Sequence, residues 1–332
     1  MKKLYKVAVV GCGGISKNHL NAISFLDNVK VVALCDIKPE RAYEKREMFG
    51  LDSKIYESFD KMLECEELDA IHISTPHYLH APMTVAALKR DINVFLEKPM
   101  CITNEEALIM LDAEKASKGR VCVCFQNRFN PGTVAAKEII NNDGGPISAF
   151  CSIFWERNEP YYTESGWRGS IETEGGGVMI NQAIHSVDLL CEFLGKPLTL
   201  CATKANHHLK GIIDVEDSCE GMIKFDSGKI GNFYATTAFC GYDYTLVFVL
   251  TKNHKIELRN GNLFVDNKLL TEEDTKSYVG KAAYGNGHKY LIKKFYDALE
   301  NDSEMPVSLE SAQYAVRILL AAYKSGDVEI KV

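Results

Sequence analysis

The fold of this chain is decided by the stretch Lys6-Val7-Ala8-Val9-Val10-Gly11-Cys12-Gly13-Gly14-Ile15-Ser16. Its first residues, rich in β-branched side chains, predict a strand buried on both faces, as in a parallel sheet. The glycines predict a turn, and the amphipathic run that follows, through Leu26, predicts a helix. A strand, a glycine-rich turn and a helix N-terminus together bind the pyrophosphate of a dinucleotide.

The glycine spacing follows G-x-G-x-x-G except at its last position. Gly11 allows the tight turn and Gly13 lets the backbone approach phosphate, whereas Ser16 replaces the third glycine. A small residue at that position still permits close packing of helix on strand. An ordinary strand–helix turn remains the alternative interpretation of this motif alone.

Asp36 adds independent support for a dinucleotide. It ends a second apolar run, about twenty residues past the glycines, where an acid accepts hydrogen bonds from a ribose 2′-hydroxyl and repels a 2′-phosphate. The sequence therefore predicts NAD(H). Two alternatives stay open: Asp36 can cap the helix that begins at Pro39, and Lys38 or Arg41 can reach the phosphate of NADP(H).

Length and composition limit the class of protein. At 332 residues, two domains are expected, and the net charge of −7 gives no basic footprint for nucleic acid. No apolar run has membrane-spanning length, and the first strand follows Met1 too closely for a signal peptide. The eleven cysteines contain no C-x-x-C pair and lie mostly in apolar runs, so reduced thiols in a cytoplasm are expected.

Strands and helices alternate from the start of the chain to about Phe125. This pattern predicts an α/β fold whose N-terminal part, residues 1–122, is a doubly wound parallel Rossmann sheet. Residues 123–332 contain mostly strands, with hairpin signals at Asp226-Ser227-Gly228-Lys229 and Asn260-Gly261-Asn262. We expect a second α+β domain with a large, mostly antiparallel open sheet, and two C-terminal helices that can pack back between the domains.

Two places carry candidate chemistry. Glu97-Lys98-Pro99 ends a predicted parallel strand, and an ammonium there can stabilise alkoxide-like charge during hydride transfer. On a predicted helix after Gly175-Gly176-Gly177, Asn181, His185 and Asp188 form a polar stripe. There His185 can exchange an alcohol proton and Asp188 can orient its ring. A solvated lysine and a solvent-facing stripe are the alternatives.

Other polar residues give weaker indications. Arg128, Trp167 and Arg168 lie near the domain change and before the glycines, where each arginine can bind a polar substrate or form a surface pair. His77 and His80 raise the question of a metal, but no matching ligand cluster accompanies them, so no metal site is predicted.

Together these motifs resemble the family of glucose–fructose oxidoreductase, inositol dehydrogenase and MocA over almost the whole chain. The resemblance implies oxidation or reduction of one carbon of a sugar, cyclitol or nucleotide-sugar with NAD(P), and oligomer contacts through the C-terminal sheet. It places the catalytic lysine on Lys98 and the acid/base histidine on His185. The cofactor site then comprises Gly11, Gly13, Gly14, Ile15, Asp36, Thr75, Pro76, His80, Glu97 and Lys98. The substrate site comprises Asn181, Asp188, Arg128, Trp167 and Arg168.

One departure from the family concerns Asn181. Inositol-type dehydrogenases carry Asp four residues before the histidine, and in this chain that position is Asn181. The side-chain amide of Asn181 is uncharged, so it cannot offset the charge of an imidazolium. We therefore expect His185 to be a weaker base, unless Asp188 compensates.

The sequence as a whole predicts a cytoplasmic, homo-oligomeric NAD-dependent oxidoreductase acting on a carbohydrate-like secondary alcohol or ketone. Two alternatives keep the dinucleotide. One uses tightly bound NAD transiently for epimerisation or elimination without net redox, and the other is a non-catalytic sensor.

Overall fold

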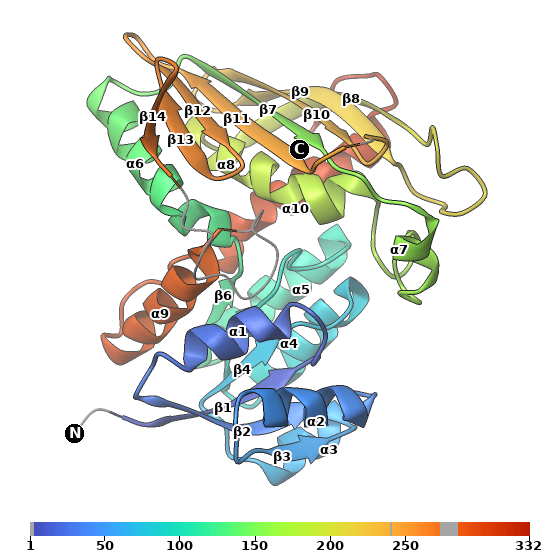
Figure 1. Ribbon diagram of the computed structural model, residues 1–332, viewed down its shortest axis with the longest axis vertical. Coiled ribbons are helices and arrows are strands. Elements are labelled where there is room, and N and C mark those ends of the chain that lie inside the picture. The colour runs from blue at the N-terminus through green and yellow to red at the C-terminus, as the bar shows by residue number, and fades with distance from the viewer. Residues whose placement is uncertain (1–2, 240, 273–284) are drawn as a thin grey trace.

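The computed structural model describes residues 3–239, 241–272 and 285–332 and contains two sheets (Figure 1). The first has six strands, all parallel, in the order β3-β2-β1-β4-β5-β6. Their bounds are β1 Tyr5–Val10, β2 Val29–Cys35, β3 Lys54–Tyr56, β4 Ala70–Ile73, β5 Asn93–Leu96 and β6 Val121–Val123. The chain reverses direction across the sheet between β1 and β4, which is where open α/β sheets bind ligands.

Helices accompany these strands in alternation. They are α1 Ser16–Ile23, α2 Pro39–Met48, α3 Phe59–Cys65, α4 His80–Leu88 and α5 Asn104–Lys115, with a 3-10 turn at His77–Leu79. The strands β1, β4 and β5 are almost wholly buried because helices cover both faces of the sheet. This is the predicted Rossmann arrangement, and it is confirmed; the sequence did not predict β3 or α3.

The second sheet has nine strands in the order β14-β13-β12-β11-β7-β10-β9-β8-β15. Among the described strands of this second sheet, only β7 and β10 pair in parallel, and the other pairs are antiparallel. The bounds are β7 Ser148–Phe154, β8 Pro197–Ala205, β9 Ser218–Phe225, β10 Ile230–Thr236, β11 Tyr244–Leu250, β12 Lys255–Arg259, β13 Asn262–Val265, β14 Lys268–Thr271 and β15 Ile330–Lys331. The predicted mostly antiparallel sheet and both hairpins, β9–β10 and β12–β13, are confirmed.

Helices of the second half join the two sheets (Figure 1). They are α6 Pro131–Asn142, α7 Glu159–Thr163, α8 Ile184–Leu194, α9 Gly287–Glu300 and α10 Leu309–Ser325, with a 3-10 turn at Gln126–Phe129 and a π-helix at Met179–Ala183. Helix α8 packs on β7 and α10 on β8, while α10 also contacts α5 and α9 contacts α1. One hydrophobic cluster therefore runs from the first sheet into the second. Among the helices that the structure describes, none is long and apolar enough to cross a bilayer.

Candidate active site

The glycine loop lies between β1 and α1 and leaves room for a ligand. Gly11 has a φ of +85°, and a Cβ there would lie 2.5 Å from the main-chain oxygen of Ser74. At Gly13 and Gly14 a Cβ would meet nothing within 4 Å. Ser16 donates from its hydroxyl to the Gly13 oxygen at 2.7 Å, so this replacement for the third glycine holds the loop in shape. Open space above the loop at the start of α1 fits a pyrophosphate.

Asp36 lies against the same loop, directly after β2. Its Oδ2 accepts a hydrogen bond from the Cys12 amide at 2.7 Å, and its Oδ1 accepts one from the Lys38 amide at 2.8 Å. These bonds fix a nearly buried carboxylate beside the glycines. The free acceptor capacity of its oxygens is where a ribose hydroxyl can donate.

His80 connects two loops at the same edge of the sheet. Its Nδ1 lies 2.6 Å from the Pro99 oxygen, and its Nε2 lies 2.9 Å from the oxygen of Thr75, which with Pro76 follows β4. Burial lowers the pKa of His80, although both carbonyls favour the protonated ring. Each ring nitrogen of His80 contacts a main-chain carbonyl oxygen. His80 therefore acts on any cofactor indirectly, by positioning these two loops.

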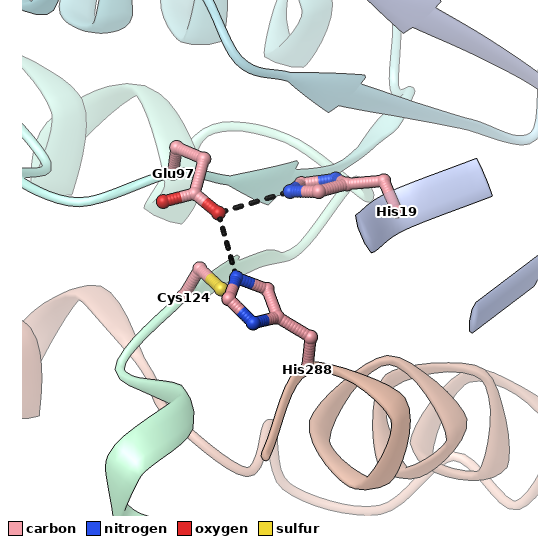
Figure 2. A group of neighbouring side chains, drawn as sticks. All are labelled: His19, Glu97, Cys124 and His288. Carbon is pink, nitrogen blue, oxygen red and sulfur yellow. Dashed lines mark hydrogen bonds and ion pairs between the residues drawn. The ribbon is translucent and has the colours of Figure 1, made fainter. Parts of the chain in front are cut away.

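Glu97 points away from the sheet edge into a buried cluster (Figure 2). Its Oε1 lies 2.9 Å from His19 Nε2 and 3.3 Å from His288 Nε2. Burial raises the pKa of Glu97, but these two imidazoles outweigh burial and hold the pKa well below its usual range. The Glu97 carboxylate therefore has its hydrogen-bond partners inside the protein and not at the carboxyl edge of the sheet. The next residue in the sequence, Lys98, does lie at that edge.

The same cluster has the donor types of a metal site. The ligand atoms of His19, Glu97, Cys124 and His288 all lie within 4.8 Å of one another, and Zn²⁺ accepts all three ligand types. The hydrogen bonds of Glu97 with His19 and His288 account for the arrangement of these three residues. Burial raises the pKa of the Cys124 thiol well above its usual range, so this thiol stays protonated. The sequence did not predict this group, since its members come from four separate segments.

Lys98 reaches from the end of β5 to the second half of the chain. Its Nζ donates to the main-chain oxygen of Asn181 at 2.9 Å. Burial lowers the pKa of Lys98, and the carboxylates of Glu97 and Glu174 oppose that shift. The ammonium is therefore held in a partly buried, partly compensated environment, in which its charge acts more strongly on a nearby oxygen than it would in water.

His185 lies in the first turn of α8 with both ring nitrogens unpaired among the described residues. Burial, helped by the positive charge of Lys98, places the pKa of His185 well below its usual value. The ring is therefore neutral at neutral pH and offers one donor and one acceptor nitrogen. This is the state in which an imidazole can take a proton from an alcohol.

Asp188 does not orient His185, contrary to the expectation from the sequence. Its two carboxylate oxygens accept hydrogen bonds from Arg128 Nη2 and Nε at 2.6 Å and 2.8 Å. Arg128 Nη1 also lies 3.2 Å from Glu192. This buried ion pair joins the Gln126–Phe129 turn to α8. Arg128 and Asp188, which the sequence analysis placed in the substrate site, therefore bind each other. The predicted solvent-facing alternative for the stripe is wrong too, since His185 and Asp188 are buried.

The three glycines before this helix accommodate protein atoms. A Cβ on Gly175 would approach Ile102, one on Gly176 would lie 1.9 Å from the Tyr323 hydroxyl, and one on Gly177 would lie 1.8 Å from the Glu216 main-chain oxygen. The protein itself therefore approaches all three glycines closely.

Arg168 and Trp167 line the region between α7 and the glycines. The Arg168 guanidinium lies 4.6 Å from the ring centroid of Tyr161 and 4.7 Å from that of Trp167. Its Nε has no partner among the described residues. The charge of Arg168 acts on the buried carboxyl group of Glu174, a residue that the sequence analysis did not single out. The only signal for it in the sequence is an acidic residue directly before three glycines.

Comparisons with known proteins agree with this geometry. Residues 5–125 match the oxidoreductase family model GFO_IDH_MocA with its NAD-binding Rossmann fold, and residues 133–254 match the GFO/IDH/MocA C-terminal domain. The chain belongs to the Gfo/Idh/MocA family of oxidoreductases and carries an NAD-binding Rossmann domain.

Two relatives and one solved structure show which kinds of oxidoreductase this chain is similar to. Oxidoreductase P35 of Formosa agariphila is 28% identical over 57% of this chain and 60% of its own length. Inositol 2-dehydrogenase of Salmonella typhimurium is 32% identical over 43% of this chain and 42% of its own. The matched stretches thus span less than two thirds of the length of each of these two relatives. The WlbA dehydrogenase of Bordetella pertussis, solved with NADH and UDP-GlcNAcA, is 26% identical with a TM-score of 0.88, covering 99% of this chain and 98% of that one.

Proposed function

We propose that the protein is an NAD-dependent oxidoreductase that transfers a hydride between nicotinamide and a secondary alcohol or ketone of a sugar, cyclitol or nucleotide-sugar. One observation carries the proposal. Lys98, a partly buried ammonium directly after β5, lies close enough to His185 to lower the pKa of its buried imidazole, and both nitrogens of that ring are unpaired among the described residues. Support for the substrate class comes from relatives named inositol 2-dehydrogenase and from the UDP-GlcNAcA complex of WlbA.

The residues present fit NAD(H). Gly13 and Gly14 leave open space at the start of α1, and Asp36 presents a carboxylate beside it. NAD(H), when bound, supplies the hydride acceptor or donor. In oxidation, Lys98 donates a hydrogen bond to the substrate oxygen and stabilises its developing negative charge, while His185 accepts the hydroxyl proton. In reduction, His185 returns that proton to the oxygen.

A panel assay tests this function. The purified protein is incubated with sugars, cyclitols and nucleotide-sugars, each with NAD⁺ and with NADP⁺, and the nicotinamide absorbance is followed. Net reduction of NAD⁺ by one class supports the proposal. Conversion of substrate without an absorbance change, by protein that retains NAD(H) on purification, identifies transient use of the cofactor. Saturable binding without turnover identifies a sensor.

We further propose a homo-oligomer, dimer or tetramer, assembled through the second sheet. Its face opposite α8 and α10 exposes apolar side chains, including Phe150 on β7, Tyr234 on β10 and Leu250 on β11. Apolar patches of this kind mark interaction sites. Light scattering of the wild type and of Tyr234→Arg tests the assignment, and an unchanged mass contradicts it.

A cytoplasmic location is part of the same proposal. Ten described cysteines are free and most are buried as small apolar side chains, for example Cys35 and Cys151. Fractionation of the native host, followed by detection of the protein, tests the location.

A further inference from the structure

Glu174 places a carboxyl group inside the candidate active site, immediately before the three glycines. The residue is fully buried, and its Oε2 accepts a hydrogen bond from the Gly169 amide at 2.6 Å. Its Oε1 accepts one from the side-chain amide nitrogen of Asn181. Its main-chain oxygen lies 2.8 Å from His77 Nδ1, so side chain and backbone are both anchored.

Asn181 joins this carboxyl group to the reacting ammonium. Its main-chain oxygen accepts from Lys98 Nζ at 2.9 Å, while its Nδ2 also donates to the Tyr161 hydroxyl at 3.2 Å. Both Nδ2 hydrogens therefore have acceptors, Glu174 and Tyr161. Among the residues that the structure describes, the amide oxygen of Asn181 has no hydrogen-bond partner, so this end of the side chain can accept a hydrogen bond.

We infer that Glu174 is a positioning residue, whose carboxylate fixes the Asn181 amide with its oxygen free to accept a hydrogen bond from a substrate hydroxyl. The inference rests on the proposed function. In this pair the negative charge lies on the loop before the glycines, and the acceptor oxygen lies on the π-helix at Met179–Ala183. Sequence reasoning placed no charge here.

The physical basis is the difference between a carboxylate and a carboxylic acid. An ionised carboxylate only accepts, so it selects the nitrogen end of an amide; a protonated one can donate to the oxygen end and lets the amide turn round. Burial raises the pKa of Glu174 to about 7, against the opposing effect of its hydrogen bonds from Gly169 and Asn181. The ordered arrangement therefore forms as the pH rises through about 7.

Several groups face this carboxyl from the elements around it. They are Arg168 on the preceding loop, Lys98 after β5, His77 before α4, Tyr161 and Tyr162 on α7, and Glu216 before β9. The positive charge of Arg168 favours the ionised carboxylate and the charge of Glu216 disfavours it. The positive charge of Arg168 therefore opposes a further rise in the pKa of Glu174.

Variants of the pair test the inference on the full chain. Glu174→Gln removes the charge, Asn181→Asp puts two carboxyl groups in contact, and the double exchange Glu174→Gln/Asn181→Asp returns one carboxylate and one amide in swapped places. Glu172→Gln, an exposed acid on the same loop, is the matched control. The readouts are kcat and KM against pH, with the substrate found by the panel and NAD⁺.

We expect the wild-type kcat to rise with pH through about 7. Glu174→Gln should lower kcat by up to about 10²-fold, the cost of a misplaced contact, and abolish that rise. The double exchange should recover most of the loss, while Glu172→Gln should match the wild type. Unchanged kcat and an unchanged rise in Glu174→Gln overturn the inference, as does a double exchange no better than either single variant.

A second measurement separates this inference from the proposed function. A carboxyl whose pKa is raised in the folded state binds a proton that the unfolded chain does not, so its stability contribution falls as the pH rises through about 7. The difference in Tm between wild type and Glu174→Gln should therefore fall between about pH 5 and pH 7. A flat difference overturns the inference even with an active enzyme, whereas the fall without turnover on any panel member refutes the proposed function, and with it the substrate role of Asn181, and leaves only the ionised contact between Glu174 and Asn181 supported.

Discussion

Lys98 donates a hydrogen bond from its ammonium to the main-chain oxygen of Asn181, across 2.9 Å and between the two halves of the molecule. Lys98 follows a strand of the first sheet, and Asn181 lies in the π-helix that leads into α8. The position of the reacting cation is therefore set by both halves together. Any change that shifts the second half relative to the first is expected to move this charge.

Lys98→Met tests the role of that cation. The variant keeps most of the length of the unbranched side chain but lacks the donor, so we expect turnover to fall by about 10²–10³-fold, the loss typical of one transition-state donor. NADH affinity, measured by fluorescence titration, should stay near that of the wild type. Lys89→Met, an exposed lysine after α4, is the control. If Lys98→Met keeps half of its activity, Lys98 takes no part in the reaction.

Asp36→Ser tests the choice of cofactor. The carboxylate disfavours a 2′-phosphate and offers acceptors to a 2′-hydroxyl, so the wild type should prefer NAD⁺ in kcat/KM. The substitution should narrow the preference by lowering kcat/KM for NAD⁺ and raising it for NADP⁺. Asp60→Ser, an exposed acid on α3, should leave the ratio unchanged. A wild type that prefers NADP⁺ contradicts the assignment of Asp36.

His185 is expected to produce a separate pH effect below that of Glu174. Burial and Lys98 place the pKa of His185 well below its usual value, so the neutral base is already formed at neutral pH and is lost only in acid. In the Glu174→Gln background, oxidation should therefore rise with pH along a limb that lies below pH about 6.5. Adding His185→Gln should remove that limb and lower kcat by about 10²–10⁴-fold. If the limb lies above about pH 6.5, the pKa of His185 is not lowered, and the buried, Lys98-facing environment assigned to this ring is contradicted.

Gly13→Ala and Gly177→Ala should separate binding from folding. A methyl group at Gly13 meets no protein atom within 4 Å, so the variant should unfold like the wild type but bind NADH more weakly. A methyl group at Gly177 would lie 1.8 Å from the Glu216 oxygen, so that variant should be strongly destabilised. Urea unfolding and NADH titration of both variants check the pair. Equal losses of NADH affinity in two equally stable proteins would refute this division.

Asp188→Ala should cost stability. It leaves the nearly buried Arg128 guanidinium without its two-point partner, and breaking such a pair costs about 3–5 kcal/mol. Asp297→Ala breaks an exposed helix pair with Lys293 and is the control, expected to change the urea midpoint little. A small effect of Asp188→Ala would show that Glu192, which also contacts Arg128, is a sufficient partner.

The sequence by itself determined the Rossmann half, the mostly antiparallel character of the second sheet and the glycine turn between β1 and α1. These features follow from local patterns: a β-branched run before Gly11 and Gly13, and an acid at the end of β2. Hairpin turns are local too, and both predicted ones are present. Short elements such as β3 and α3 escaped prediction because three to seven residues give too little periodicity.

Tertiary structure decided which partner each polar side chain has. Asp188 and His185 lie one turn apart along the sequence, yet Asp188 pairs with Arg128, sixty residues away. Glu97 is joined to His19 and His288 from two distant helices, and Asn181 receives its carboxylate from a loop rather than from its own helix. A hydrogen bond forms between atoms that packing brings within about 3 Å, and the distance in space between such residues is not written in their spacing along the chain.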